Sequence, residues 1–289
     1  MDTVIQLIVN GLLLGGVLAL SALGFNIIFG VMRVVNLAHG DLVVIAALTC
    51  AVAYARWHIN PLLLLPFTAL GGFILGAAIQ RFLLRRLPAE IASGEASSLT
   101  LTFGLSYFLA GAGLWIFGGQ IRSVPYLTGA IQLGAVSVPQ ARLLAFVAAI
   151  LIAALLGVFL RYTPIGRAIR ATSMNLDGAL ACGVDADFVR TISFGLGSAV
   201  AAAAGTLLSY IYTFNPQDGI PFTISAFAVI AIGGLGSYTG VLLGALVLGF
   251  AQAFASYYAG STLADAAPYV LFVLVMLVLP QGILGRRTA

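Results

Sequence analysis

Three polar residues that could carry chemistry lie close together between two long apolar stretches of the sequence: Asn36, His39 and Asp41. Polar and ionisable groups at membrane depth are costly and usually face protein or water, so a functional role is the default hypothesis for them. Acid–base catalysis or metal binding would need further partners, and no other histidine or carboxylate pairs with this cluster in the sequence. The pattern therefore gives little support to catalysis or to a metal site.

Two interpretations of residues 36–41 stay open. In the first, Asn36, His39, Gly40 and Asp41 line a translocation path. In the second, they form a helix break at the membrane interface. Asn36 would then cap a helix, Gly40 would relieve the backbone, and Asp41 would favour the positive end of the next helix dipole. The second interpretation explains the spacing without any ligand.

A glycine-rich run at residues 233–240, GGLGSYTG, could be mistaken for a phosphate-binding loop. Such a loop needs a lysine that reaches the nucleotide phosphates, and all 13 basic residues of this chain are arginines. If the protein uses ATP, another subunit must bind it. We interpret Gly233, Gly234 and Gly236 as a sharp break or a close approach between two membrane segments, where small residues let backbones touch.

The connector 161–190 is the most polar segment of the chain. Arg167 and Arg170 belong to a predicted short basic helix, and a second short helix is predicted from about residue 175 to 182. Gly183 would end that second helix, because glycine suits the left-handed position after a helix. Asp177 flanks a small apolar face, and a surface helix that exposes apolar residues needs a partner. The alternative is a solvated loop.

The elements that must position these residues are long uncharged stretches. A bilayer core of about 30 Å requires about 20 apolar helical residues, and only a self-bonded backbone such as a helix can cross it. Residues 222–235 are short for a crossing and form either a tilted helix or a re-entrant half-helix. The sequence predicts an all-α polytopic membrane protein of eight to nine helices, at about 4–30, 40–56, 61–83, 98–118, 141–160, 190–213, 222–235, 240–259 and 267–285.

Composition sets further bounds. The chain is 61% hydrophobic and only 8% charged, whereas soluble domains carry about a quarter charged residues, so a large soluble module is excluded. We expect one membrane domain over residues 1–289, in contact with lipid. The net charge of +4 is dispersed through connectors, which gives no nucleic-acid patch. Cys50 and Cys182 predict neither a disulfide nor a metal site, and the first helix, which lacks a basic leader, is expected to be retained.

Arginines in short loops favour the cytoplasmic side. With the C-terminus and its Arg286 and Arg287 inside, nine crossings place ten of the thirteen arginines in the cytoplasm. Arg56, Arg122 and Arg142 then lie outside. The side of the N-terminus depends on whether 222–235 crosses. The connector 119–140 would be extracytoplasmic, and its alternating, β-branched pieces predict a small hairpin or lid.

Several islands of sequence resemble one known family. The run GLLLGGVLALSALGFNIIFGVMRVVNLAHGDLVVIAA, residues 11–47, closely resembles the permeases of LIV-type ABC importers for branched-chain amino acids. Further matches in family order are TPIGRA at 163–168, AIGGLGS at 231–237 and PQGILG at 280–285. Asp177, Gly178, Ala179 and Gly183 resemble a degenerate form of the EAA loop that docks on the ATPase of ABC importers.

The resemblance implies a permease subunit in a bacterial inner membrane, without an ATPase site, catalytic residue, metal or cofactor of its own. Its implied partners are a second related or identical permease, two cytoplasmic ATPase subunits that bind ATP, and a periplasmic solute-binding protein. The coupling residues would be Arg167, Arg170, Asp177, Gly178, Ala179 and Gly183. Permeases for urea, short amides and similar solutes look alike. Rival classes are an ion-coupled secondary transporter and a membrane enzyme, for which the ionisable groups are too few and too scattered.

Overall fold

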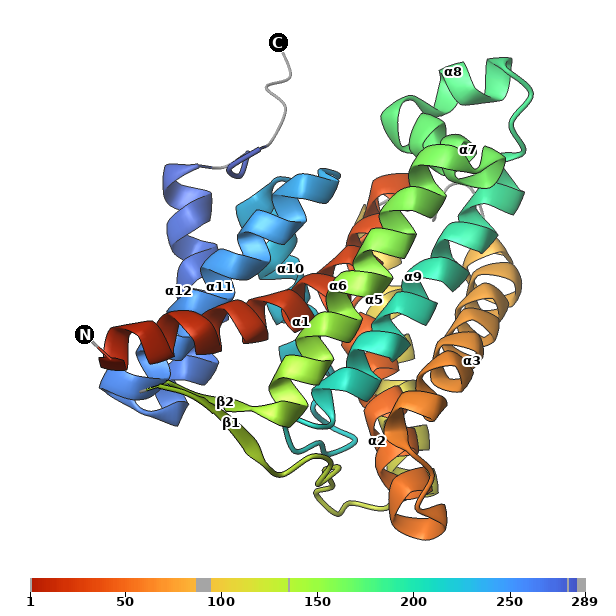
Figure 1. Ribbon diagram of the computed structural model, residues 1–289. Helices are drawn as coiled ribbons and strands as arrows, with labels where there is room; N and C mark the ends of the chain where they lie inside the picture. The colour runs from red at the N-terminus through yellow and green to blue at the C-terminus, as the bar shows by residue number, and fades with distance from the viewer. Residues whose placement is uncertain (1, 87–94, 135, 280, 285–289) are drawn as a thin grey trace.

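The computed structural model describes residues 2–86, 95–134, 136–279 and 281–284, and these are mostly helical (Figure 1). By length and composition, seven helices among them can cross a membrane, and two shorter apolar helices accompany them at 219–233 and 262–278. The prediction of an all-α polytopic membrane protein is confirmed. The seven are α1 (Asp2–Met32), α2 (His39–Trp57), α3 (Pro61–Phe82), α5 (Glu95–Phe117), α6 (Gln140–Tyr162), α9 (Ala186–Leu208) and α11 (Tyr238–Ala259), and the two shorter helices are α10 (Gly219–Gly233) and α12 (Ser261–Val278).

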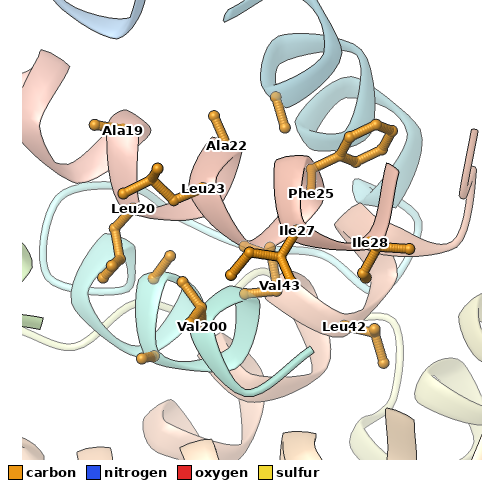
Figure 2. Packing of buried hydrophobic residues seen from close by; sticks show 14 of the residues in the cluster. Ala19, Leu20, Ala22, Leu23, Phe25, Ile27, Ile28, Leu42, Val43 and Val200 are labelled. Atoms are coloured by element: carbon orange, nitrogen blue, oxygen red, sulfur yellow. The ribbon is translucent and has the colours of Figure 1, made fainter. Parts of the chain in front are cut away.

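Two helices form the centre of the bundle. α1 packs against α11, α9 and α6, and α9 packs against α3, α1 and α2. Figure 2 shows apolar side chains in this core, among them Leu23 of α1, Val43 of α2 and Val200 of α9. Lipid gives no hydrophobic drive between helices, so close van der Waals packing must hold them, and small residues permit it. Gly24 and Gly197 show this, because a side chain on either would overlap the other helix.

Most predicted helix bounds agree with the structure within a few residues, but α9 and α12 differ. α9 begins at Ala186 rather than 190, because the Asp185 carboxylate accepts hydrogen bonds from the Asp187 and Phe188 amides and caps the helix. It ends at Leu208 rather than 213. α12 covers 261–278 rather than 267–285, so the helix ends before Pro280, as helices usually do before proline.

The short predicted segment at 222–235 is α10, whose 15 residues give a length of about 22 Å. Its first turn lies against the first turn of α2, because Gly219 and Gly40 are in close contact. Two of its last carbonyls accept hydrogen bonds from amides near the C-terminus. The amides of Ile283 and Leu284 donate to the carbonyls of Ile232 and Gly233 at 2.8 and 3.0 Å.

The predicted hairpin in the connector 119–140 is present. β1 (Ala130–Leu133) pairs antiparallel with β2 (Val136–Pro139), with Leu133 opposite Val136. The side chain of Gln6 in α1 holds β2 in place, because it donates to the carbonyl of Ser137 and accepts from its amide, each at 2.8 Å. The hairpin is therefore fixed to the first turns of α1.

Candidate functional site

Residues 33–38, which connect α1 to α2, have no regular secondary structure. Arg33 has a positive φ of 56° and its guanidinium donates to the carbonyl of Ser173 at 3.0 Å. Further along, the carbonyl of Val35 accepts from Thr102 of α5. The carbonyl of Leu37 accepts from Thr223 of α10 at 2.9 Å. Irregular backbone at membrane depth is tolerated only where protein satisfies it, and these side chains do so.

Asn36 forms the turn that precedes α2. Its side-chain oxygen accepts from the Ala38 amide at 3.1 Å, and its carbonyl accepts from the His39 amide at 3.2 Å. The N-cap position itself falls on Ala38, whose methyl group cannot accept a hydrogen bond. The prediction that Asn36 caps the helix is therefore wrong. Its side chain instead forms a turn before α2, because the amide that it satisfies, that of Ala38, precedes the first residue of the helix.

His39, the first residue of α2, is fully buried. Its Nε2 lies 3.1 Å from the carbonyl of Ser21 in α1, and since a carbonyl only accepts, Nε2 carries the proton. The ring also packs edge-on against Phe25 at 5.0 Å between centroids. In this arrangement His39 ties the start of α2 to the middle of α1.

Gly40 lies where the first turns of α2 and α10 meet. Its amide donates to the Thr223 hydroxyl at 2.8 Å. A Cβ on Gly40 would overlap the carbonyl oxygen of Gly219 and lie 2.7 Å from the Thr223 amide nitrogen. The close approach of two backbones therefore requires glycine here.

Asp41 lies in the first turn of α2, as predicted for a carboxylate that favours a helix N-terminus. It is 2% exposed and lies against Gly219, the first residue of α10, so two helix N-termini converge on it. The hydroxyl of Ser106 in α5 donates to its carboxylate. Asp41 thus helps to hold α2, α5 and α10 together at the buried junction. We call Asn36, His39, Gly40, Asp41 and Thr223 the helix junction.

Replacing His39 separates a structural role from a path-lining role. If the ring serves to tie α2 to α1, His39→Gln keeps a donor for Ser21 and leaves complex yield and uptake near normal. His39→Ala leaves a buried carbonyl with one partner fewer and a cavity, at a cost of about 2–3 kcal/mol. Uptake and complex yield, measured on the same preparations, check this. Loss of uptake by His39→Gln at normal yield would instead place His39 on the path.

The glycine run after α10 makes a sharp turn into α11. Gly234 and Gly236 have positive φ angles of 104° and 79°, which glycine adopts without strain. The Gly236 amide donates at 3.0 Å to the side chain of Asn26 in α1, and the Ser237 hydroxyl caps α11. Gly233 lies against Gly240, where a Cβ on either would overlap the other's backbone. The run is therefore a turn between two helices whose backbones are in contact, as predicted.

The connector 161–190 folds as two short helices, α7 (Pro164–Met174) and α8 (Leu176–Ala181), which stand at one end of the bundle in Figure 1. Asn175 caps α8 by accepting from the Gly178 amide at 2.9 Å. Gly183 follows α8 with a φ of +80°, as predicted for a glycine that ends a helix. We call α7 and α8 the end helices.

The end helices expose both charge and apolar surface. Arg167, Arg170, Asp177 and Gly178 are exposed, whereas Ala179 is buried. Leu180 is 50% exposed. Sequence reasoning missed further exposed apolar residues at this end, among them Met174 at 67% and Phe188 at 50%, because neither lies in the motif-like stretch.

The helix junction and the end helices are separate sites in the structure. The helix junction is buried among α1, α2, α5 and α10. One hydrogen bond, from Arg33 to the carbonyl of Ser173, connects the end helices to the segment that precedes the junction. Thr223 and Asn26 were not predicted, because their partners are about two hundred residues away in the sequence and no local pattern marks them. Within the described ranges, His, Cys, Asp and Glu form no group of three that could hold a metal.

Comparison with known proteins places most of the chain in one group. Residues 7–279 match the family model described as branched-chain amino acid transport system, permease component. The LivH permease of the high-affinity branched-chain amino acid transport system of Escherichia coli K12 is 30% identical, over 98% of this chain and 96% of that protein. The BraD permease of Pseudomonas aeruginosa gives the same three values.

A more distant relative is a probable branched-chain amino acid permease, also called LivH, of Methanocaldococcus jannaschii. It is 26% identical over 97% of this chain and 92% of its own. Among solved structures, a metal-chelate type ABC transporter in an inward-facing conformation aligns with a TM-score of 0.51 and 18% identity, over 95% of this chain and 86% of the other. At that identity the likeness concerns the fold alone.

Proposed function

The chain belongs to the family of permease components of branched-chain amino acid transport systems, and from that premise we propose that it imports branched-chain amino acids as a subunit of an ABC importer. The observation that carries this proposal is the match of residues 7–279 to the family model, together with 30% identity to relatives over nearly their full length. The chain is a multi-pass membrane protein and a transport subunit of an ABC system.

The remaining subunits are those that membership of the family implies, and the absence of lysine, which leaves no phosphate-binding lysine for ATP, supports a separate ATPase. Two ATPase subunits would bind ATP, a second permease would complete the membrane part, and a periplasmic binding protein would deliver the solute. ATP-driven closure of the ATPases would act on the end helices and shift the bundle between outward-open and inward-open states.

The charge distribution supports a cytoplasmic position for the end helices. Of the eleven arginines in the described ranges, eight lie at that end: Arg33, Arg81, Arg85, Arg86, Arg161, Arg167, Arg170 and Arg190. Arg56, Arg122 and Arg142 lie at the end of the β-hairpin. By the positive-inside rule, the hairpin would then lie outside an inner membrane. Arg286 and Arg287, on which the predicted side of the C-terminus also depended, lie outside the described residues.

Reconstitution tests the proposal. The chain alone in liposomes should show no leucine uptake driven by ATP or by a proton or sodium gradient, because its sequence has no lysine for a phosphate-binding loop and the proposed cycle is driven by separate ATPase subunits. Adding the ATPases, the second permease and the loaded binding protein should give ATP-dependent leucine uptake. Omitting the binding protein is the control, and a panel with urea and short amides tests the substrate. Robust gradient-driven uptake by the isolated chain would overturn the proposal in favour of a secondary transporter.

A further inference from the structure

A cavity of about 380 Å³ opens at the hairpin end of the bundle, between α1, α6, α11, α12 and the segment after α9. Arg142 of α6 and Asp265 of α12 both line it. A second cavity of about 560 Å³ adjoins it and shares Tyr212, Gln252 and Asp265 as lining residues. Both volumes fall within the range of about 300–1,000 Å³ that is typical of small-molecule sites.

The two charges of this cavity are not paired with one another. The ion pairs among the residues that the structure describes are those of Asp187 with Arg85 and Arg190, at the opposite end of the bundle. Tyr212 lines the same cavity, and both charges act on its hydroxyl. Burial raises the pKa of Tyr212 to about 12, the Arg142 charge lowers it and the Asp265 charge raises it. Arg142 is half-buried and Asp265 is exposed, so a cation and an anion line one open cavity without forming an ion pair with each other.

A polar acceptor and apolar walls complete the cavity. The side-chain oxygen of Gln252 is buried and has no hydrogen-bond partner in the described part of the chain, although buried polar atoms nearly always have one. Leu7, Leu14 and Ile211 line the first cavity, and Phe222 lines the second. The first cavity therefore offers Arg142, Asp265, the free acceptor of Gln252 and aliphatic surface, and Asp218 is a further carboxylate in the lining of the second.

We propose that this cavity binds the amino acid itself, with Arg142 on its carboxylate, Asp265 and Gln252 on its ammonium group, and the aliphatic walls around its side chain. The charge pattern selects the class of ligand. A zwitterion satisfies both charges with charge-assisted hydrogen bonds, whereas a neutral amide, a simple amine or a simple carboxylate leaves at least one charge without a counter-charge. The inference rests on the proposed function and adds to it a substrate site within the permease, which we call the zwitterion site.

Protection of a thiol tests the zwitterion site directly in the assembled transporter. Ser256 lines the cavity and is exposed, so a cysteine placed there by Ser256→Cys should react with a polar thiol reagent. Cys182→Ser removes the exposed native thiol, and Cys50 is buried. Leucine at millimolar concentration should slow the reaction several-fold. 3-Methylbutylamine, which lacks the carboxylate, and 4-methylpentanoate, which lacks the ammonium group, should not.

Two charge-removing variants and a control position complete the design. Arg142→Gln and Asp265→Asn, each combined with Ser256→Cys, should raise the leucine concentration that gives half-protection by about tenfold or more, since each removes one charged hydrogen-bond partner. Arg142→Lys keeps the charge and should retain most of the protection. Ala55→Cys, in a separate cavity at the same end lined by Arg56 and Arg122, should label at the same rate with and without leucine.

Leucine uptake and thiol labelling at position 256 test the proposed function and the zwitterion site separately. If the wild-type complex imports leucine with ATP but leucine does not slow labelling at position 256, the zwitterion site is wrong and the function stands. Equal protection by the amine or the carboxylate would also overturn it, because recognition would then not require both charges. A wild-type complex that imports no branched-chain amino acid would instead overturn the proposed function.

Discussion

Gly40→Val is expected to abolish both assembly and uptake. The valine Cβ would overlap the carbonyl oxygen of Gly219 and press on the Thr223 amide, and both of these are backbone groups that no rotamer change can move aside. Overpacking of a core side chain usually costs about 1–3 kcal/mol, and a clash between two helix backbones at the bundle centre should exceed about 4 kcal/mol. The amount of full-length protein in the membrane and the yield of purified complex measure the effect.

Gly71→Val is the matched control for this prediction. Gly71 lies within the helix α3, as Gly40 lies within α2, but a Cβ there meets no atom within 4 Å. The control should therefore insert and assemble nearly as the wild type does. A normal yield of Gly40→Val complex would show that α2 and α10 separate readily and would contradict the close junction described here.

Gly219→Ala offers a graded second measurement on the same junction. Its Cβ would overlap the carboxylate of Asp41, which is a side chain and so can move, and would come no closer than 3.1 Å to a backbone atom, the Asp41 amide nitrogen. The loss of complex should therefore be smaller than for Gly40→Val.

The helices could be predicted from the sequence because hydrocarbon imposes one requirement on every crossing, an uncharged stretch with a self-bonded backbone. The same reasoning found the turn chemistry at Gly183, which depends only on local residues. It misplaced the start of α9, because Asp185 and Asp187 look like loop residues until Asp185 is seen to cap the helix. It extended the last helix too far, because the residues after Val278 remain apolar although helicity has ended.

The partners within the helix junction could not be predicted. Asn36, His39, Gly40 and Asp41 were recognisable as a group, but their contacts come from Ser21 and Thr223, which no spacing rule connects to them. The same holds for the zwitterion site. In the sequence, Arg142 falls at the start of one predicted helix and Asp265 lies between two others, and only the packing of α6 and α12 around one cavity brings them together.

The end helices also contact the segment of chain that leads to the helix junction. Arg33 donates to the carbonyl of Ser173 near the end of α7, and three residues later the chain reaches Asn36 of the helix junction. α7 itself packs on α1, α6 and α9. A displacement of the end helices would therefore act on the segment 33–38, whose irregular backbone is held by side chains of α5 and α10. A movement of the end helices can therefore reach the helix junction through one hydrogen bond, from Arg33 to Ser173, and the short stretch of chain from Arg33 to Asn36.

Leu180→Asp is expected to eliminate ATP-dependent uptake while leaving the permease inserted. Leu180 is 50% exposed on α8, so its replacement costs this chain little of its own stability. In the docked complex a leucine would be buried against an ATPase, which contributes about 1.5–3 kcal/mol, and a carboxylate in its place would be desolvated at further cost. The affinity between permease and ATPase should fall by roughly a hundredfold or more. Co-purification of the ATPase and uptake in liposomes measure the two effects.

Controls distinguish loss of docking from damage to the fold. Ile121→Asp makes the same kind of change at a residue that is 69% exposed near the hairpin end, and it should leave ATPase association unchanged. Gly183→Val should weaken association, because its φ of +80° strains a β-branched residue, whereas Gly183→Asn, which tolerates that region, should be milder. Asp177→Arg should weaken association as well, by reversing the charge beside the apolar face. If cysteines placed at 174–182 never crosslink to an ATPase in the assembled complex, the end helices are not the docking surface, and energy must reach the bundle by another contact.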